Sequence, residues 1–235
     1  MTQVVITGGT GFVGSHLVRA CLARGESVTV VARPSSDAWR LADVRDRISH
    51  VRLDATVPHV LTECRLRARP DVIFHLGMTT GHCLAGPDRT FAGALVTNVI
   101  PLATLLDAAA GLPRPPRRLV RAGSIAEYGP RMKVMSEGDR EAPADPYGYS
   151  SLAATHLLSA RAPSLPFQAV TARLALTYGP MQSEDFFIPS AIENALAGRP
   201  VEVRRPDDRR DLVYVEDVVN GLLALADAAS LDGTT

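Results

Sequence analysis

Residues 4–14 read VVITGGTGFVG, and this stretch decides the fold of the chain. A short apolar, β-branched run comes first and predicts a strand, and apolar residues with helical spacing follow it. The glycines between the two stand at positions 8, 11 and 14. Gly8 permits a sharp turn, Gly11 lets a pyrophosphate approach the backbone, and Gly14 lets the helix pack closely on the strand. We therefore predict a dinucleotide-binding loop whose phosphates rest on the helix N-terminus, in preference to a tight turn with only a structural role.

Beyond this loop, short apolar runs alternate with helical patterns along the chain. The predicted strands are residues 4–6, 27–31, 51–53, 72–76, 118–122 and 169–174. Such an alternation predicts a parallel sheet that helices cover on both faces. We expect an α/β fold, a doubly wound parallel sheet of the Rossmann type. Its dinucleotide-binding domain is predicted over residues 1–175, with a small, truncated substrate-binding part over residues 176–235.

Composition argues against several classes of function. The chain has 25 basic and 25 acidic residues among 235, and no basic stretch is interleaved with aromatic side chains, so nucleic acid is not an expected partner. The chain opens on a predicted strand and has no run of about 20 apolar residues, so we expect a cytoplasmic protein that does not enter a membrane. The cysteines lack paired spacing, so neither a disulfide nor a metal site is expected. They are Cys21, Cys64 and Cys83.

The second predicted strand is followed by Ala32 and Arg33, and this end of the strand indicates the phosphate preference of the cofactor. A carboxylate here would accept the ribose 2′-hydroxyl of NAD, but none is present. Arg33 can instead pair with a 2′-phosphate through its planar guanidinium. NADP, as NADPH, is therefore the favoured cofactor, and NAD is the alternative if Arg33 is only a solvated surface arginine. Asp54 ends the third predicted strand and fits either a hydrogen bond to the adenine edge or a strand-terminal turn.

Segments along nearly the whole chain carry a resemblance to a known family. They are residues 7–14, 71–76, 98, 124–129, 146–147, 173–180 and 210–217. In these segments the chain resembles the extended short-chain dehydrogenase/reductases, the NAD-dependent epimerase/dehydratase group that acts on nucleotide sugars. The resemblance implies cofactor contacts in addition to those argued above. They are Phe12, Val13, Ala55, Leu76, Asn98, Tyr147 and Ser151.

Tyr147 and Ser124 are the principal catalytic residues that the resemblance implies. Tyr147 would exchange a proton with the substrate oxygen while hydride moves to or from the nicotinamide, and Ser124 would hold that oxygen. A carbonyl that takes up hydride develops negative charge, so it needs a proton donor and a second hydrogen-bond donor within reach. Glu127 allows two interpretations, a group that supports the site or a loop carboxylate paired with an arginine.

The chain departs from the family four residues after Tyr147, where relatives have a lysine and this chain has Ser151. The single lysine of the chain is Lys133, so no neighbouring lysine can fill the gap. In the family this lysine binds the nicotinamide ribose and lowers the pKa of the tyrosine, and Ser151 can take over only the first role, weakly. A tyrosine with an unassisted pKa of about 10 is only about 0.1% ionised at pH 7. The departure therefore favours a phenol that donates a proton over a phenolate that accepts one.

This asymmetry favours the one-way reduction of a ketone over epimerisation, which needs both directions of proton transfer. Dehydration is also disfavoured, because Ile125 and Ala126 stand where 4,6-dehydratases carry acids. We predict an NADPH-dependent ketoreductase whose substrate is a ketone on a nucleotide-linked deoxysugar or a tailoring-pathway intermediate. The alternatives are an NAD-dependent nucleotide-sugar epimerase and a catalytically impaired nucleotide-binding or sensor protein.

Three residues are candidates for binding the substrate. Leu176 stands where relatives have an asparagine that helps to bind the sugar nucleotide. Arg210 matches an arginine that pairs with a diphosphate, unless it belongs to a solvated basic run. Thr79 follows the fourth predicted strand and can line the pocket. The oligomeric state is left open by the sequence, although members of the resembled family often form homodimers through helices that here span residues 95–110 and 147–160.

Overall fold

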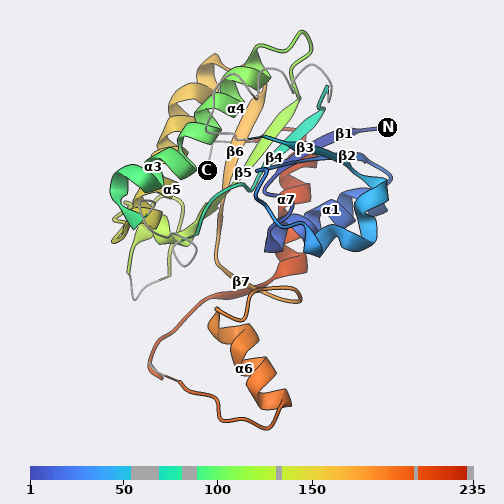
Figure 1. Ribbon diagram of the computed structural model, residues 1–235. Helices are drawn as coiled ribbons and strands as arrows, with labels where there is room; N and C mark the ends of the chain where they lie inside the picture. Colours follow the sequence, from blue (N-terminus) through green and yellow to red (C-terminus); the bar gives the residue numbers. More distant parts are fainter. Residues whose placement is uncertain (54–68, 81–88, 131–133, 204–205, 232–235) are drawn as a thin grey trace.

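The structure is a computed structural model that describes residues 1–53, 69–80, 89–130, 134–203 and 206–231. Its centre is a six-stranded parallel sheet with the strand order β3-β2-β1-β4-β5-β6 (Figure 1). The strands are β1 (Gln3–Thr7), β2 (Ser27–Ala32), β3 (Ser49–Arg52), β4 (Val72–His75), β5 (Arg118–Ser124) and β6 (Gln168–Leu174). The strand order reverses between β1 and β4, which is the place where doubly wound sheets bind dinucleotides. The predicted fold is confirmed.

Helices cover both faces of the sheet (Figure 1). On one face lie α1 (Phe12–Ala23) and α7 (Val215–Asp227), and on the other lie α4 (Ile100–Ala110) and α5 (Pro146–Arg161). The other helical elements are η1 (Trp39–Arg47), α3 (Phe91–Asn98), η3 (Ile125–Tyr128), η4 (Ala162–Ser164) and α6 (Phe187–Leu196).

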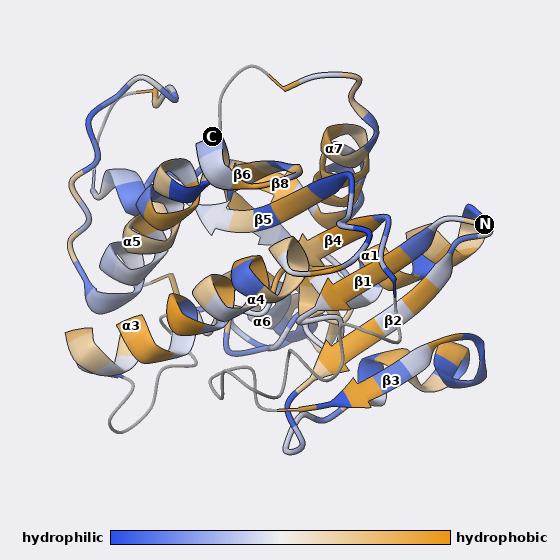
Figure 2. Ribbon diagram, turned by 90° about the horizontal axis from the view of Figure 1, so that it is seen from above, coloured by the Kyte–Doolittle hydropathy of each residue, from blue (hydrophilic) through white to orange (hydrophobic). Residues whose placement is uncertain are grey.

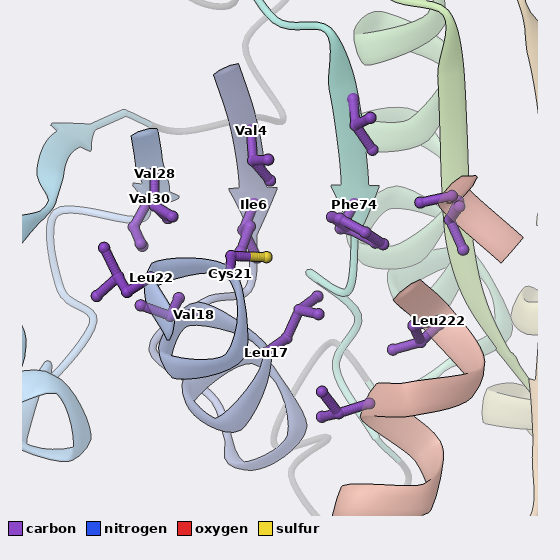
Figure 3. Packing of buried hydrophobic residues seen from close by; sticks show 14 of the residues in the cluster. Val4, Ile6, Leu17, Val18, Cys21, Leu22, Val28, Val30, Phe74 and Leu222 are labelled. Atoms are coloured by element: carbon purple, nitrogen blue, oxygen red, sulfur yellow. The ribbon is translucent and has the colours of Figure 1, made fainter. Parts of the chain in front are cut away.

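Successive residues of the central strands are buried on opposite faces of the sheet. Ile6 and Phe74 pack against α1 and α7, and their neighbours Val5 and Ile73 pack against α4 and α5. Figure 3 shows the first of these layers, in which Leu222 of α7 lies against the sheet beside the side chains of α1. Two buried faces explain why the central strands are largely apolar, as Figure 2 shows for β1 and β4, which are mostly orange.

The helical pattern predicted over residues 95–110 is divided between two helices. α3 ends at Asn98 and α4 begins at Ile100, with Val99 between them. Pro101 has no backbone N–H, so it would interrupt a continuous helix, whereas the first turn of a new helix tolerates it. The combined segment Phe91–Ala110 is apolar and long enough to cross a membrane by composition alone. Its α4 half is nevertheless buried against the sheet, as expected for a core helix.

A second, two-stranded parallel sheet follows β6. It pairs β7 (Leu176–Tyr178) with β8 (Leu212–Tyr214), and α6 lies beside it, away from the main sheet (Figure 1). The chain then returns through α7 to the main sheet. The predicted division into residues 1–175 and 176–235 coincides with this change of sheet, and it stays a prediction.

Candidate active site

The glycine loop joins β1 to α1 as predicted, and two of its glycines are required by the packing of the protein itself. Gly8 has a φ of +71°, and a Cβ there would lie 2.5 Å from the backbone of Leu76. A Cβ on Gly14 would lie 2.2 Å from the Gly8 carbonyl oxygen. No side chain fits at these distances. Gly8 and Gly14 are therefore needed whether or not a ligand binds.

Gly11 is different, because the protein crowds it much less than Gly8 and Gly14. A Cβ on Gly11 would have one neighbour within 4 Å, the Gly8 carbonyl oxygen at 3.2 Å, and the backbone is extended with a φ of −76°. Gly11 is the N-cap of α1, and the first backbone N–H groups of a helix lack partners within it. The first turn, which begins with Phe12 and Val13, contains no acidic residue that would occupy those groups. The loop thus fits a diphosphate held over the helix N-terminus.

The Gly11→Ala variant is expected to weaken the binding of a nicotinamide dinucleotide at least about tenfold, which corresponds to about 1.4 kcal/mol. The added methyl group would occupy space next to the helix N-terminus, while the melting temperature should change little. Calorimetric titration measures the affinity. Gly221→Ala on α7 is the matched control, because a Cβ there meets nothing within 4 Å. Unchanged affinity in Gly11→Ala would contradict the assignment of this loop.

The other residues predicted to bind the cofactor lie around the same end of the sheet. Leu76 N–H bonds the Thr7 carbonyl at 3.0 Å, and thereby continues the pairing of β1 with β4. Arg33 directly follows β2 and is exposed. Asp54 and Ala55 lie outside the described residues. Next to Leu76, burial lowers the pKa of His75 to about 3, so this histidine is neutral.

Asn98 is buried, and it connects two of the predicted site segments. Its side-chain oxygen accepts a hydrogen bond from Thr79 N–H at 2.8 Å, and its nitrogen donates to the Thr79 carbonyl at 3.2 Å and to Ser150 Oγ at 2.9 Å. The structure therefore brings Asn98 and Thr79 together. Asn98 holds the chain after β4 against α5, beside the turn that carries Tyr147.

Tyr147 lies in the first turn of α5, and local sequence explains why the helix begins there. Asp145 is the N-cap and accepts a hydrogen bond from Gly148 N–H at 2.7 Å, and Pro146 occupies the first turn, where its missing N–H is harmless. Ser124 ends β5, and its Oγ accepts a hydrogen bond from Ala126 N–H at 3.1 Å. The Ser124 hydroxyl also lies close enough to the Tyr147 phenol to lower its pKa. The two predicted catalytic residues therefore meet.

Burial raises the pKa of the Tyr147 phenol above its ordinary value of 10. The Ser124 hydroxyl and the charge of Arg121 act in the opposite direction, but burial outweighs them, and the charges of Glu127 and Asp145 add to its effect. The phenol is consequently protonated at neutral pH.

Ser151 is fully buried, one helical turn beyond Tyr147. Its hydroxyl donates a hydrogen bond to Glu127 Oε1 at 2.6 Å and accepts one from Arg121 Nη2 at 3.2 Å. The hydroxyl hydrogen is thus already engaged within the protein. The predicted contact of Ser151 with a nicotinamide ribose stays a prediction, and in this structure Ser151 connects α5 to charged side chains beneath it.

Those side chains form a buried ionic cluster, defined here as Arg121, Glu127 and Arg173. Glu127 is 0% exposed and lies 2.7 Å from Arg173 Nε through Oε2, while Arg121 Nη1 is 3.9 Å from its Oε1. Glu127 also accepts hydrogen bonds from the Ser124 N–H, from Ser151 and from the Thr155 hydroxyl. Both interpretations of Glu127 hold, because it is paired with an arginine and also supports the catalytic segments.

Arg121 is the member of this cluster that sequence reasoning missed. It is 1% exposed and lies within the predicted strand at residues 118–122. A signal was present, because an arginine in the middle of a largely apolar strand must find a buried partner, and Glu127 follows in η3, directly after the same strand.

Two of the three predicted substrate residues, Leu176 and Arg210, lie at the small sheet, whereas Thr79 lies beside Asn98. Leu176 begins β7 and is 38% exposed, and its N–H bonds the Asp211 carbonyl at 3.2 Å, beside Arg210. The structure therefore places Leu176 and the Arg210 segment at the same end of that sheet. Arg210 forms an ion pair with Asp208 at 2.5 Å. Within the described ranges no group of three His, Cys, Asp or Glu side chains is placed to hold a metal ion.

Comparison with known proteins identifies the family to which this geometry belongs. The model of the NAD dependent epimerase/dehydratase family matches residues 4–234. The chain belongs to this family. The family, predicted from sequence as a group of extended short-chain dehydrogenase/reductases, is therefore confirmed, and so is the expectation of an oxidoreductase-type enzyme.

Three relatives illustrate the range of the family. The dTDP-glucose 4,6-dehydratase of Mycolicibacterium smegmatis is 30% identical over 226 residues, which are 92% of this chain and 66% of the dehydratase. The structure of MoeE5 in complex with UDP-glucuronic acid and NAD is 32% identical, with a TM-score of 0.81 over 97% of this chain and 73% of MoeE5. The UDP-glucose 4-epimerase of Thermus thermophilus in complex with NAD is 28% identical, with a TM-score of 0.80 over 98% of this chain and 75% of the epimerase. The chain thus spans about two thirds to three quarters of each relative.

Proposed function

We propose that this protein reduces a ketone with NADPH, and that Tyr147 is the proton donor. The observation that carries the proposal is the half-buried Tyr147 phenol in the first turn of α5, which lies near the Ser124 hydroxyl and whose pKa burial holds above its ordinary value. A phenol in this state is an acid at neutral pH. Oxidation of an alcohol would instead require the phenolate as a base.

The residues suit the reduction of a carbonyl group. A reduced nicotinamide dinucleotide, whose diphosphate the glycine loop would hold, would supply the hydride, and the substrate oxygen would then carry the electron pair of the former carbonyl double bond. Ser124 donates a hydrogen bond to this oxygen, and Tyr147 transfers its phenolic proton to it. The products are an alcohol and a tyrosinate, and the tyrosinate regains a proton from water. Hydrogen bonds aimed at the developing charge stabilise it most where water is excluded.

A ketone on a nucleotide-linked deoxysugar is the substrate that we propose, and a ketone of a tailoring pathway is the alternative. Support comes from the relatives, because MoeE5 was solved with UDP-glucuronic acid. The dehydratase relative raises the question of water elimination. Here Ile125 and Ala126, which form the first turn of η3 after Ser124, offer no acid or base. The absorbance of NADPH, followed against a panel of nucleotide-linked and free keto-sugars, tests the proposal, and no oxidation of NADPH with any of them would contradict it.

Arg33 supports NADPH as the cofactor, because an exposed guanidinium directly after β2 suits a 2′-phosphate. Arg33→Ala is expected to weaken NADPH binding about tenfold, since a charge-assisted contact contributes about 1.5–3 kcal/mol, and to leave NADH binding unchanged. Calorimetry with each cofactor measures this. Arg47→Ala, an exposed arginine on η1, is the matched control. Equal effects on both cofactors would instead favour NAD, which the structures of MoeE5 and the Thermus enzyme contain.

A nucleotide-sugar epimerase is the second candidate, and the similarity to the Thermus thermophilus UDP-glucose 4-epimerase favours it. An epimerase would interconvert two sugars with tightly held NAD and would consume no reduced cofactor. Incubation with UDP-glucose without added cofactor, followed by separation of the sugar epimers, distinguishes the two functions.

A further inference from the structure

A buried guanidinium lies directly beneath the helix that carries Tyr147. Arg121 is the fourth residue of β5, and its side chain is 1% exposed. Its Nη2 donates hydrogen bonds to the Ser151 carbonyl at 3.0 Å and to Ser151 Oγ at 3.2 Å, and its Nη1 donates to Thr155 Oγ1 at 2.8 Å. These contacts place the guanidinium against consecutive turns of α5.

Ser151 is four residues from Tyr147, and residues with this spacing share a face of a helix about one turn apart. The guanidinium therefore lies under the face of α5 that carries the Tyr147 side chain. The electrostatic interaction between the two groups acts in both directions, because the charge of Arg121 favours an ionised Tyr147 and an ionised Tyr147 favours a charged Arg121.

The positive charge of Arg121 is only partly compensated. Glu127 is closest to Arg173, at 2.7 Å, and lies 3.9 Å from Arg121. Counted with Glu141 the two arginines are balanced, but Glu141 is 21% exposed and contacts Arg173, at 2.6 Å from its Nη2. The excess of positive charge therefore lies at Arg121.

The other titratable groups near Arg121 and Tyr147 do not cancel this excess. His75, on the neighbouring β4, is neutral at neutral pH. Asp145, the N-cap of α5, is exposed and acts on Tyr147 from the solvent side. Burial lowers the pKa of Arg121 to about 10, which still leaves it charged at neutral pH.

We propose that Arg121 stabilises the tyrosinate that Tyr147 becomes when it gives its proton to the substrate. The O–H bond of Tyr147 breaks, a new O–H bond forms on the substrate alkoxide, and the electron pair left on the phenolic oxygen faces a fixed, desolvated cation. Charges interact more strongly in such surroundings than in water. Arg121 acts through Tyr147 and is therefore a positioning residue. The inference rests on Tyr147 being the proton donor of the proposed function.

The test measures the pKa of residue 147 directly. A fluorinated tyrosine, which is intrinsically more acidic, is introduced at position 147 alone, and its ionisation is followed by 19F NMR in the holoenzyme below pH 9. Arg121→Met is expected to raise this pKa by about one unit, a tenfold change in the ionisation equilibrium. In the unlabelled enzyme the same variant is expected to lower kcat for ketone reduction about tenfold at pH 7 while KM stays within about twofold.

Two further variants separate charge from packing. Thr155→Val removes a hydrogen-bond partner of both Arg121 and Glu127 without changing any charge, so the pKa of residue 147 should stay unchanged. Arg121→Met combined with Ser151→Lys returns a cation to the same face of α5, and it should restore the lower pKa. Arg121→Gln keeps polar donors in the cavity and replaces Arg121→Met if that variant does not fold.

The inference is overturned if a folded Arg121 variant leaves the pKa of residue 147 at its wild-type value. It is also overturned if Thr155→Val raises this pKa as much as Arg121→Met does. Since the NMR measurement needs no turnover, the two proposals fail separately. A shifted pKa in a protein that reduces no ketone refutes only the proposed function. If ketone reduction depends on Tyr147 but the Arg121 variant leaves the pKa of residue 147 unchanged, only the role of Arg121 is refuted.

Discussion

Replacing Tyr147 with phenylalanine is expected to slow ketone reduction about 10²- to 10⁴-fold, the range typical for the loss of a positioned general acid. Phenylalanine keeps the ring in the first turn of α5 and removes only the hydroxyl that meets Ser124. NADPH affinity should stay within about twofold, because the diphosphate is held at the glycine loop. Oxidation of NADPH, followed by absorbance, gives the rate, and calorimetry gives the affinity.

Tyr149→Phe is the matched control for this experiment. Tyr149 lies two residues further along α5, is 48% exposed and contacts Phe91. The same chemical change there should leave the rate unaffected. Full activity of Tyr147→Phe would show that another group donates the proton, whereas equal losses in both variants would indicate damage to α5.

The second large effect concerns stability. Glu127→Ala is expected to lower the free energy of unfolding by about 3–5 kcal/mol, because it leaves buried arginines without their carboxylate. Arg121 and Arg173 would then repel each other, and the hydroxyls of Ser151 and Thr155 would lose an acceptor. Urea denaturation followed by circular dichroism measures the change.

Glu141→Ala provides the comparison, since Glu141 pairs with the same Arg173 at 2.6 Å but is 21% exposed. Its removal should cost about 1 kcal/mol or less, as for most ion pairs near the surface. If Glu127→Ala costs no more than Glu141→Ala, the buried cluster does not hold the catalytic segments together.

Much of the fold could be predicted because it depends on local patterns. The strands at residues 72–76 and 169–174 are mostly apolar, and the glycine loop has a fixed spacing, so both can be predicted from neighbouring residues. The division at Val99 could also have been predicted, because Pro101 stands within the helical pattern and cannot continue a helix.

The electrostatic surroundings of Tyr147 depend on contacts distant in sequence, and the sequence alone did not reveal them. Only the packing of α5 on β5 brings Arg121 to Ser151, 30 residues away. The sequence indicated a tyrosine without an assisting cation, because Ser151 is uncharged. In our proposal, Arg121 on β5 replaces the cation that the sequence comparison expected on the helix. The substrate-binding end of the small sheet could not be predicted from local sequence either. Leu176 and the segment that contains Arg210 come together only because β7 pairs with β8.

The glycine loop also bears on how such motifs should be used to recognise nucleotide-binding proteins. A descendant of this chain that had lost its ligand would still be selected to retain Gly8 and Gly14, because their hydrogen atoms occupy space that no larger side chain can enter. Substitution of Gly11 would therefore appear before substitution of Gly8 or Gly14 in a protein that no longer binds the ligand. Among homologues with this fold, the middle glycine is therefore the diagnostic one.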